Sequence, residues 1–103
     1  MAQPARSYAH GATAIPLLDM TIGEALDRAA ERWPDQDAVV VRDQGVRLTY
    51  AALRRAANGL AAGLIALGLA PGDRIGLWSP TRVEWVLSQY AAARPLAARR
   101  SAA

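Results

Sequence analysis

Few side chains in this sequence combine the type and spacing that catalysis or metal binding requires. Glu24 and Asp27 lie three residues apart, so on a helix they would share one face and could act as a carboxylate pair. We interpret them instead as the capping and first-turn acids of that helix. His10 is the single histidine and has no acidic neighbour, which makes it a poor general base or ligand. We therefore assign no catalytic, cofactor-binding or metal-ligating residue.

Two residue types that carry much enzyme chemistry are absent. All 12 basic residues are arginines and there is no cysteine, so lysine-dependent steps, thiolate nucleophiles and disulfides are excluded. The glycines of the second half do not form a phosphate-binding spacing such as GxGxxG; they are Gly59, Gly63, Gly68, Gly72 and Gly76. This Ala/Arg-rich usage is typical of a GC-rich genome. We expect a bacterial, cytoplasmic protein.

Length and charge limit the possible functions further. A chain of 103 residues makes at most one small domain with a shallow core. The net charge is +3, but most arginines alternate with acids, and we interpret the clusters as solvated charge, namely Arg54 with Arg55, and Arg94, Arg99 and Arg100. We predict no nucleic-acid partner, so a weak basic nucleic-acid binder is only a third hypothesis. No run of about 20 apolar residues is present, which predicts no membrane span.

Residues 1–20 have the pattern of an irregular leader, because polar residues and Pro16 interrupt any signal-like apolar run. Regular structure is expected from Thr21, which forms a capping box with Glu24 and starts a helix that ends near Arg32. The apolar stripe of this helix consists of Ile22, Leu26, Ala29, Ala30 and Trp33. Pro34 blocks its continuation.

Two β-branched runs, at 38–43 and 46–50, predict a β-hairpin that turns at Gln44 and Gly45, with Gly45 at positive φ. Thr49 is expected to cap a long helix that ends at Gly68 with a contact from Leu69. Its apolar stripe is Leu53, Ala57, Leu60, Leu64 and Leu67, for which we favour packing against a sheet over a coiled-coil seam.

The last two elements complete a βαβ-like pattern. Residues 74–79 predict a buried parallel strand, and Thr81 with Glu84 predicts a second capping box at the start of the last helix. The inward face of that helix is expected to hold Trp85 as a core residue, with Leu87 or Ser88, and Ala92. The fold class is therefore α/β, with the order helix, β-hairpin, helix, strand, helix.

This succession resembles the amino-terminal stretch of AMP-forming acyl-CoA synthetases, most of all the medium-chain fatty acid–CoA ligase branch. The residues that carry the resemblance run from about Ser7 to Arg94 and include SYAHG, PLLDMTIGEALDRAAERWPDQDAVVV and RLTYAALRRAANGLAAGLIALGLAPGDRIGLWSP. The resemblance implies that residues 21–94 are an incomplete amino-terminal subdomain of an AMP-binding ligase fold. It also implies a parent enzyme that uses ATP and Mg²⁺ to form an acyl-adenylate and then transfers the acyl group to coenzyme A.

The family's phosphate-binding loop and catalytic lysine have no counterpart in this sequence, so no site residue is carried over. Thr81 stands where many relatives have Asn. After Arg94 the similarity ends in an Ala/Arg-rich tail at 95–103, which we expect to be disordered. We expect a truncated or frameshifted gene product, with an annotated fragment or a true short protein as alternatives. The predicted function is a noncatalytic fragment of a fatty acyl-CoA synthetase; the alternative is a homo-oligomeric or sheet-complementing interaction module that uses exposed apolar faces.

Overall fold

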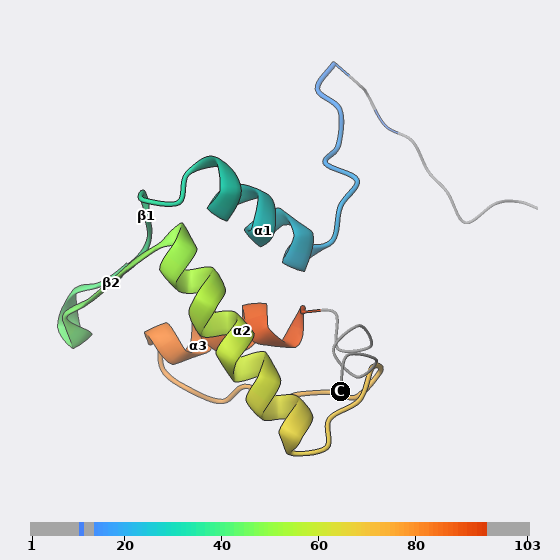
Figure 1. The fold of residues 1–103 in the computed structure, drawn as a ribbon, viewed down its shortest axis with the longest axis vertical. Helices are drawn as coiled ribbons and strands as arrows, with labels where there is room; N and C mark the ends of the chain where they lie inside the picture. The colour runs from blue at the N-terminus through green and yellow to red at the C-terminus, as the bar shows by residue number, and fades with distance from the viewer. Residues whose placement is uncertain (1–10, 12–13, 95–103) are drawn as a thin grey trace, which may run out of the picture.

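The computed structural model describes residue 11 and residues 14–94. The described elements are α1 (Ile22–Arg32), β1 (Asp37–Val41), the short 3-10 helix η1 (Arg42–Gln44), β2 (Val46–Thr49), α2 (Tyr50–Ala66) and α3 (Val83–Ala92). In Figure 1, α2 runs through the centre of the molecule, with α1 beside it, α3 crossing it and the hairpin at its start. This mixed architecture confirms the predicted α/β class.

The helix α1 begins as the sequence predicts. Thr21 Oγ1 accepts a hydrogen bond from the Glu24 N–H, and Glu24 Oε2 accepts one from the Thr21 N–H, each at 3.1 Å. Leu26 and Ala30 are buried, whereas Ile22 at the start of the stripe is exposed. Trp33 is also exposed, and the Arg32 guanidinium lies 4.8 Å from the centre of its ring. The buried part of the predicted stripe is therefore its middle.

The hairpin pairs β1 and β2 in antiparallel register, with Val39 opposite Leu48 and Val41 opposite Val46. Its turn is longer than the two residues predicted, because η1 adds a short 3-10 helix before Gly45. Gly45 has φ 64°, as expected for a glycine in a tight hairpin turn. The four paired apolar side chains are half-buried. One side of the hairpin therefore faces the helices.

The helix α2 has both predicted ends. Thr49 Oγ1 accepts a hydrogen bond from the Ala52 N–H at 3.1 Å. At the other end Gly68 has φ 101°, its N–H binds the Ile65 carbonyl at 2.9 Å, and the Leu69 N–H binds the Leu64 carbonyl at 3.2 Å. These two bonds form a Schellman motif. Glycine is needed here because the position is left-handed.

The apolar stripe of α2 is only partly buried. Leu53 and Ala57 are in the core together with Ala61, which lies outside the apolar stripe predicted from the sequence. By contrast, Leu60 is partly exposed and Leu67 is 82% exposed. The buried residues recur every four positions, and two of them are alanines, which lets the neighbouring helix approach closely. The larger leucines lie beside this line of contact.

The predicted strand at 74–79 is not formed. The described residues contain one sheet, which has only the two hairpin strands. No backbone hydrogen bond joins residues 74–79 to any other described residue, and the apolar side chains of the segment are exposed rather than buried. A strand needs a neighbouring strand to accept its ladder of hydrogen bonds. The hairpin does not supply one for this segment.

The start of α3 also differs from the prediction. The helix begins at Val83 with Arg82 as its N-cap, and Thr81 does not cap it, so the second capping box is wrong. Trp85 is 38% exposed and Ala92 is exposed, so neither is a core residue. The side chains of α3 in or against the core are Val83, Val86, Leu87, Tyr90 and Ala91. These residues recur every three or four positions, so they share the face of α3 that packs against α2.

Residue 11 and residues 14–20, the described part of the predicted leader, contain no helix or strand. His10, Arg99, Arg100 and the tail lie outside the described residues. No helix in the described part of the chain is long and apolar enough to cross a membrane.

Candidate functional site

The predicted carboxylate pair is not a pair in the structure. Glu24 closes the capping box of α1, whereas Asp27 turns to Arg94 at the other end of the described chain. Among residues 11 and 14–94 no group of three or more His, Cys, Asp and Glu side chains could hold a metal ion. The cap assignment of Glu24 is confirmed. Asp27 was expected to interact with the dipole of the first helical turn, but it instead accepts a hydrogen bond from Arg94.

Arg94 is a buried residue that fastens α1 to the end of α3. Its Nη1 donates to the Gly23 carbonyl at 3.1 Å, and its Nη2 donates to Asp27 Oδ1 at 2.8 Å. The Arg94 side chain is only 7% exposed, so its interpretation as solvated charge is wrong. Because its partners lie 71 and 67 residues away in sequence, no local pattern could reveal this contact.

Gly23 allows this contact by its small size. A Cβ atom at Gly23 would lie 2.8 Å from the Ala93 carbonyl oxygen, closer than two such atoms can approach. The first turn of α1 thus packs directly on the backbone at the end of α3. The contact from Arg94 and the close approach at Gly23 together hold the amino-terminal helix on the molecule.

Gln44 connects the hairpin turn to the start of α3. Its Oε1 accepts a hydrogen bond from the Val83 N–H at 2.8 Å, which replaces the missing local cap. Its Nε2 donates to Glu84 Oε2 at 3.1 Å, and Arg82 Nε donates to the same oxygen at 3.2 Å. Hydrogen bonds from the backbone N–H of Glu84, then from Gln44 and Arg82, hold the pKa of Glu84 below its ordinary value.

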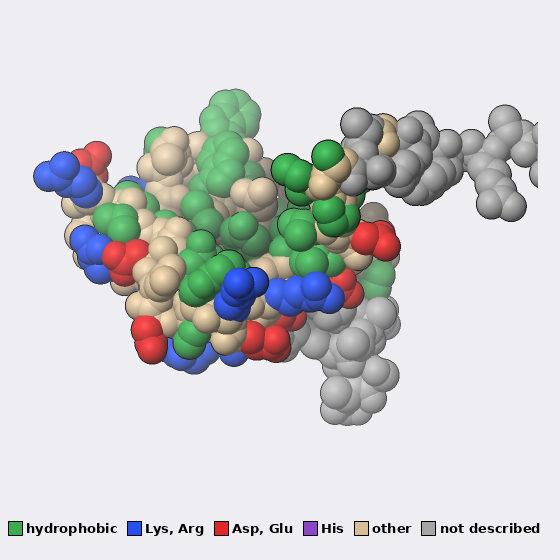
Figure 2. Space-filling model, turned by 90° about the horizontal axis from the view of Figure 1, so that it is seen from above, with side chains coloured by type: hydrophobic (Ala, Val, Ile, Leu, Met, Phe, Trp, Pro, Cys, Tyr) green, Lys and Arg blue, Asp and Glu red, His purple; other side chains and the backbone are tan. Residues whose placement is uncertain are grey.

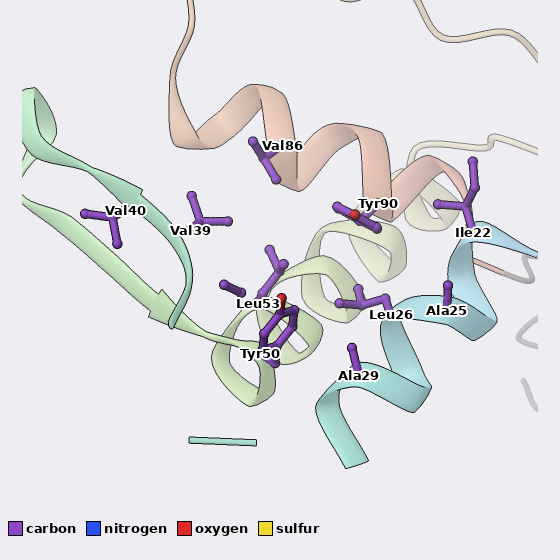
Figure 3. Close-up of a pocket in the computed structure, with 11 residues that line it drawn as sticks. Ile22, Ala25, Leu26, Ala29, Val39, Val40, Tyr50, Leu53, Val86 and Tyr90 are labelled. Carbon is purple, nitrogen blue, oxygen red and sulfur yellow. The ribbon is translucent and has the colours of Figure 1, made fainter. Parts of the chain in front are cut away.

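An open apolar groove of about 640 Å³ lies between α1, β1, the start of α2 and α3 (Figure 3). It is lined by Ile22, Ala25, Leu26, Ala29, Ala38, Val39, Val40, Tyr50, Leu53, Val86 and Tyr90. The two tyrosines bring the only side-chain polar groups in this lining. Figure 2 shows a face on which hydrophobic side chains gather in the middle, with charged side chains on the left and along its lower part. Such a surface can bind apolar groups, but it holds no carboxylate, imidazole or cationic side chain for phosphoryl chemistry.

The family model described as AMP-binding enzyme matches residues 26–98. The chain therefore belongs to the AMP-binding enzyme family, which confirms the resemblance found in the sequence.

Curated relatives show to which members of this family the chain is similar. The mitochondrial medium-chain acyl-CoA ligase ACSF2 of Bos taurus is 43% identical over 88 residues, which cover 85% of this chain and 14% of the relative. The corresponding protein of Homo sapiens is 42% identical over 88 residues, with the same coverage. The chain thus spans about 14% of the length of the curated relatives it matches.

Solved structures show the same relation. The inhibitor-bound N-terminal domain of FACL13 from Mycobacterium tuberculosis matches with a TM-score of 0.68 and 41% identity, over 71% of this chain and 18% of that one. A fatty acyl-CoA synthetase from the same organism matches with a TM-score of 0.68 over 14% of its chain. The observed fold is therefore that of a segment of acyl-CoA synthetases.

Proposed function

We propose that this chain is the amino-terminal structural segment of an AMP-forming fatty acyl-CoA synthetase. The observation that carries the proposal is the agreement of the family match at 26–98 with relatives and structures that are 41–43% identical and are named as acyl-CoA ligases or synthetases. In this proposal the whole protein activates a fatty acid with ATP, releases pyrophosphate and transfers the acyl group to coenzyme A. A medium-chain substrate is proposed from the names of the curated relatives.

The segment by itself is proposed to be noncatalytic. During adenylate formation negative charge develops on the phosphates of ATP. Positively charged side chains, Mg²⁺ and backbone N–H groups must stabilise this charge. The apolar groove is lined by aliphatic side chains and two tyrosines, so its residues do not fit ATP with Mg²⁺. The sequence has no lysine that could contribute. In this proposal the segment contributes scaffold, and the chemistry belongs to other parts of the synthetase.

The test is ATP–pyrophosphate exchange by the purified 103-residue chain with saturated fatty acids of medium length. We expect no acid-dependent exchange, while an intact acyl-CoA synthetase in parallel gives a strong signal. Exchange that requires the fatty acid, scales with chain concentration and persists after repurification would contradict the noncatalytic assignment.

A second candidate is a self-associating module, which the exposed aliphatic residues of the apolar groove and of α2 favour. Size-exclusion chromatography with light scattering distinguishes the two, because a stable dimer of defined mass supports the module. Nucleic-acid binding has less support, since Arg47, Arg82 and Arg94 are paired with acids. A cytoplasmic location stays a prediction, which cell fractionation tests.

A further inference from the structure

Two apolar surfaces of this chain are neighbours in sequence but do not touch in the structure. The first is the open apolar groove, whose lining includes Ile22, the first residue of α1. The second is residues 15–18, in which Ile15, Leu17 and Leu18 are 84%, 91% and 72% exposed. Figure 1 shows these residues leading away from the helices at the start of α1. Burial of the second surface in the first would remove both from water.

The length of residues 15–18 matches the part of the groove that α1 lines. Ile22 and Ala29 both line the groove and are seven residues apart on α1, which corresponds to a rise of about 10.5 Å. An extended chain spans about 10 Å between the first and last residues of 15–18. A chain reversal at residues 19–20 therefore places the last residue of the segment near Ile22 and the first near Ala29. The groove volume of about 640 Å³ is sufficient for several side chains.

The reversal requires a backbone hinge, and Asp19 has the properties of one. Among the described residues it is the non-glycine residue with a positive φ, 24°. Side chains other than glycine rarely adopt this region, although aspartate tolerates it in turns. A rotation of φ at Asp19 into the ordinary negative range releases this strain and changes the direction of residues 15–18.

Pro16 and the two tyrosines of the groove make the segment and the groove chemically compatible. Pro16 fixes its own φ near about −65° and favours an extended Ile15, so less conformational entropy is lost on docking. Because Pro16 has no N–H, it brings no backbone donor that needs a partner in the groove. The hydroxyl groups of Tyr50 and Tyr90 can donate to carbonyls of the segment (Figure 3). Grooves lined by aromatic residues bind extended proline-containing segments in this way.

We propose that residues 15–18 form a strap that closes over the apolar groove. Side chains alternate along an extended backbone, so Ile15 and Leu17 share one side and insert between α1 and α3. Leu18 then lies on the outer side of the strap, beside Ile22. The closed strap covers the groove within one molecule and keeps it from binding other apolar surfaces.

A second copy of this chain is a weaker competitor for the groove. Three residues separate Leu18 from Ile22, so the strap is present at an effective concentration on the order of 1 mM. A second copy at about 1 μM is roughly 1,000-fold more dilute. Association of two chains through the groove is therefore an outcome that counts against the strap.

Disulfide trapping tests the closed position directly, because the chain has no cysteine of its own. Ile15→Cys is combined with Ala29→Cys in the groove or, as the matched control, with Arg28→Cys. Arg28 is exposed and lies outside the lining, at nearly the same distance in sequence. Under mild oxidation the intramolecular disulfide should form at least about fivefold faster with Ala29→Cys, since the two Cα atoms must come within about 7 Å. Mass spectrometry separates intramolecular from intermolecular bonds.

A charge on the strap tests whether apolar burial closes it. Leu17→Asp, added to the pair of Ile15→Cys and Ala29→Cys, should slow disulfide formation at least about fivefold, because a carboxylate is costly to bury. Trp78→Asp places the same charge on a fully exposed apolar residue outside the lining and should change the rate by less than about twofold.

Nuclear Overhauser contacts in the unaltered chain give a readout that needs no substitution. The methyl groups of Leu17 should show contacts with the ring protons of Tyr90. Absence of these contacts, equal rates for the two cysteine pairs, or equal effects of Leu17→Asp and Trp78→Asp would overturn the strap. Disulfides formed mainly between two chains would identify the groove as a dimer interface and also reject it.

Discussion

The two halves of α2 lie in contrasting surroundings. Near its start, Leu53 and Ala57 are buried against α1, α3 and the hairpin. Near its end, Leu67 is 82% exposed, and the chain continues into residues 74–79, whose backbone pairs with no described residue and whose Trp78 is fully exposed. Both halves are rich in alanine, and the first half, which is the better buried, also holds the polar residues Arg54 and Arg55. Composition therefore does not decide which half is buried.

What separates the two halves is the presence of contacts from distant parts of the sequence. The first half is surrounded by elements held by Arg94 and Gln44, which bridge 67 and 39 residues. In the second half Ala61 is still buried, but the backbone hydrogen bonds of the described residues at its end are local, as in the Schellman motif at Gly68. A helix end that is well capped but laterally uncovered is typical of a surface that another layer covers in a larger fold.

The largest change in the free energy of unfolding is expected from a substitution in the buried first half of α2, compared with one in the exposed segment after α2. Leu53→Ala should lower the free energy of unfolding by about 2–5 kcal/mol, because it leaves a cavity in the core. Trp78→Ala removes a larger side chain but should change it by less than about 0.5 kcal/mol, because Trp78 is fully exposed. Urea unfolding measures both. A larger loss for Trp78→Ala than for Leu53→Ala would mean that the 74–79 segment packs in the isolated chain.

The contact made by Arg94 is expected to have the next largest effect. Arg94→Met keeps much of the apolar volume but removes both hydrogen bonds, and should cost about 2–3 kcal/mol in unfolding free energy. This is below the cost of breaking a fully buried ion pair, since Asp27 is 38% exposed and remains partly hydrated. Thermal unfolding and hydrogen exchange of α1 measure the change.

Arg55→Met is the matched control, because Arg55 is exposed on α2. It should leave stability and the exchange of α1 unchanged. If both substitutions had the same effect, Arg94 would not hold α1 to the end of α3.

The local features of the fold could be predicted from the sequence. The capping box of Thr21 and Glu24, the cap at Thr49, the turn glycine Gly45 and the helix end at Gly68 are all set by residues a few positions apart. Their physical cause is a hydrogen bond or a backbone conformation that local residue types determine. The family followed from the same local patterns in their correct order.

The remaining features depend on partners that are distant in sequence. The local sequence predicts solvated charge at Arg94, because nothing near it indicates the contacts with Gly23 and Asp27. Thr81 and Glu84 have the spacing of a capping box, but in the structure the side chain of Gln44 in the hairpin turn caps the start of α3 instead. The strand at 74–79 was predicted from side chains alone, and a strand requires a partner that this sheet does not supply.

A third prediction tests the close approach at Gly23. Gly23→Ala places a Cβ atom 2.8 Å from the Ala93 carbonyl oxygen, so α1 must shift, at a cost of about 1–3 kcal/mol. Gly59→Ala is a control of opposite sign: it also lies within a helix but has no atom within 4 Å of the added Cβ. It should stabilise the chain by about 0.5–1 kcal/mol through helix propensity. A stabilising Gly23→Ala would show that α1 does not pack on the end of α3.

The smallest change in stability is expected at Gln44, whose side chain links the hairpin turn to the start of α3. Gln44→Ala removes the acceptor for the Val83 N–H and should cost about 1 kcal/mol, as for other helix caps. It also removes a donor to the Glu84 carboxylate, so the pKa of Glu84 should rise toward its ordinary value. Chemical denaturation measures the first change and NMR titration of Glu84 the second.

The sign of the pH dependence follows from the lowered pKa of Glu84 in the folded state. A carboxylate with a depressed pKa stabilises the fold above its unfolded pKa, and this contribution is lost as pH falls through the folded pKa. The part of the Gln44→Ala effect that comes from Glu84 should therefore be present above the unfolded pKa of Glu84 and be lost as the pH falls through its lowered folded pKa. Gln89→Ala, an exposed glutamine of the same helix, should show neither change. If the pKa of Glu84 stayed the same in Gln44→Ala, the hairpin turn would not be holding the start of α3 through this side chain.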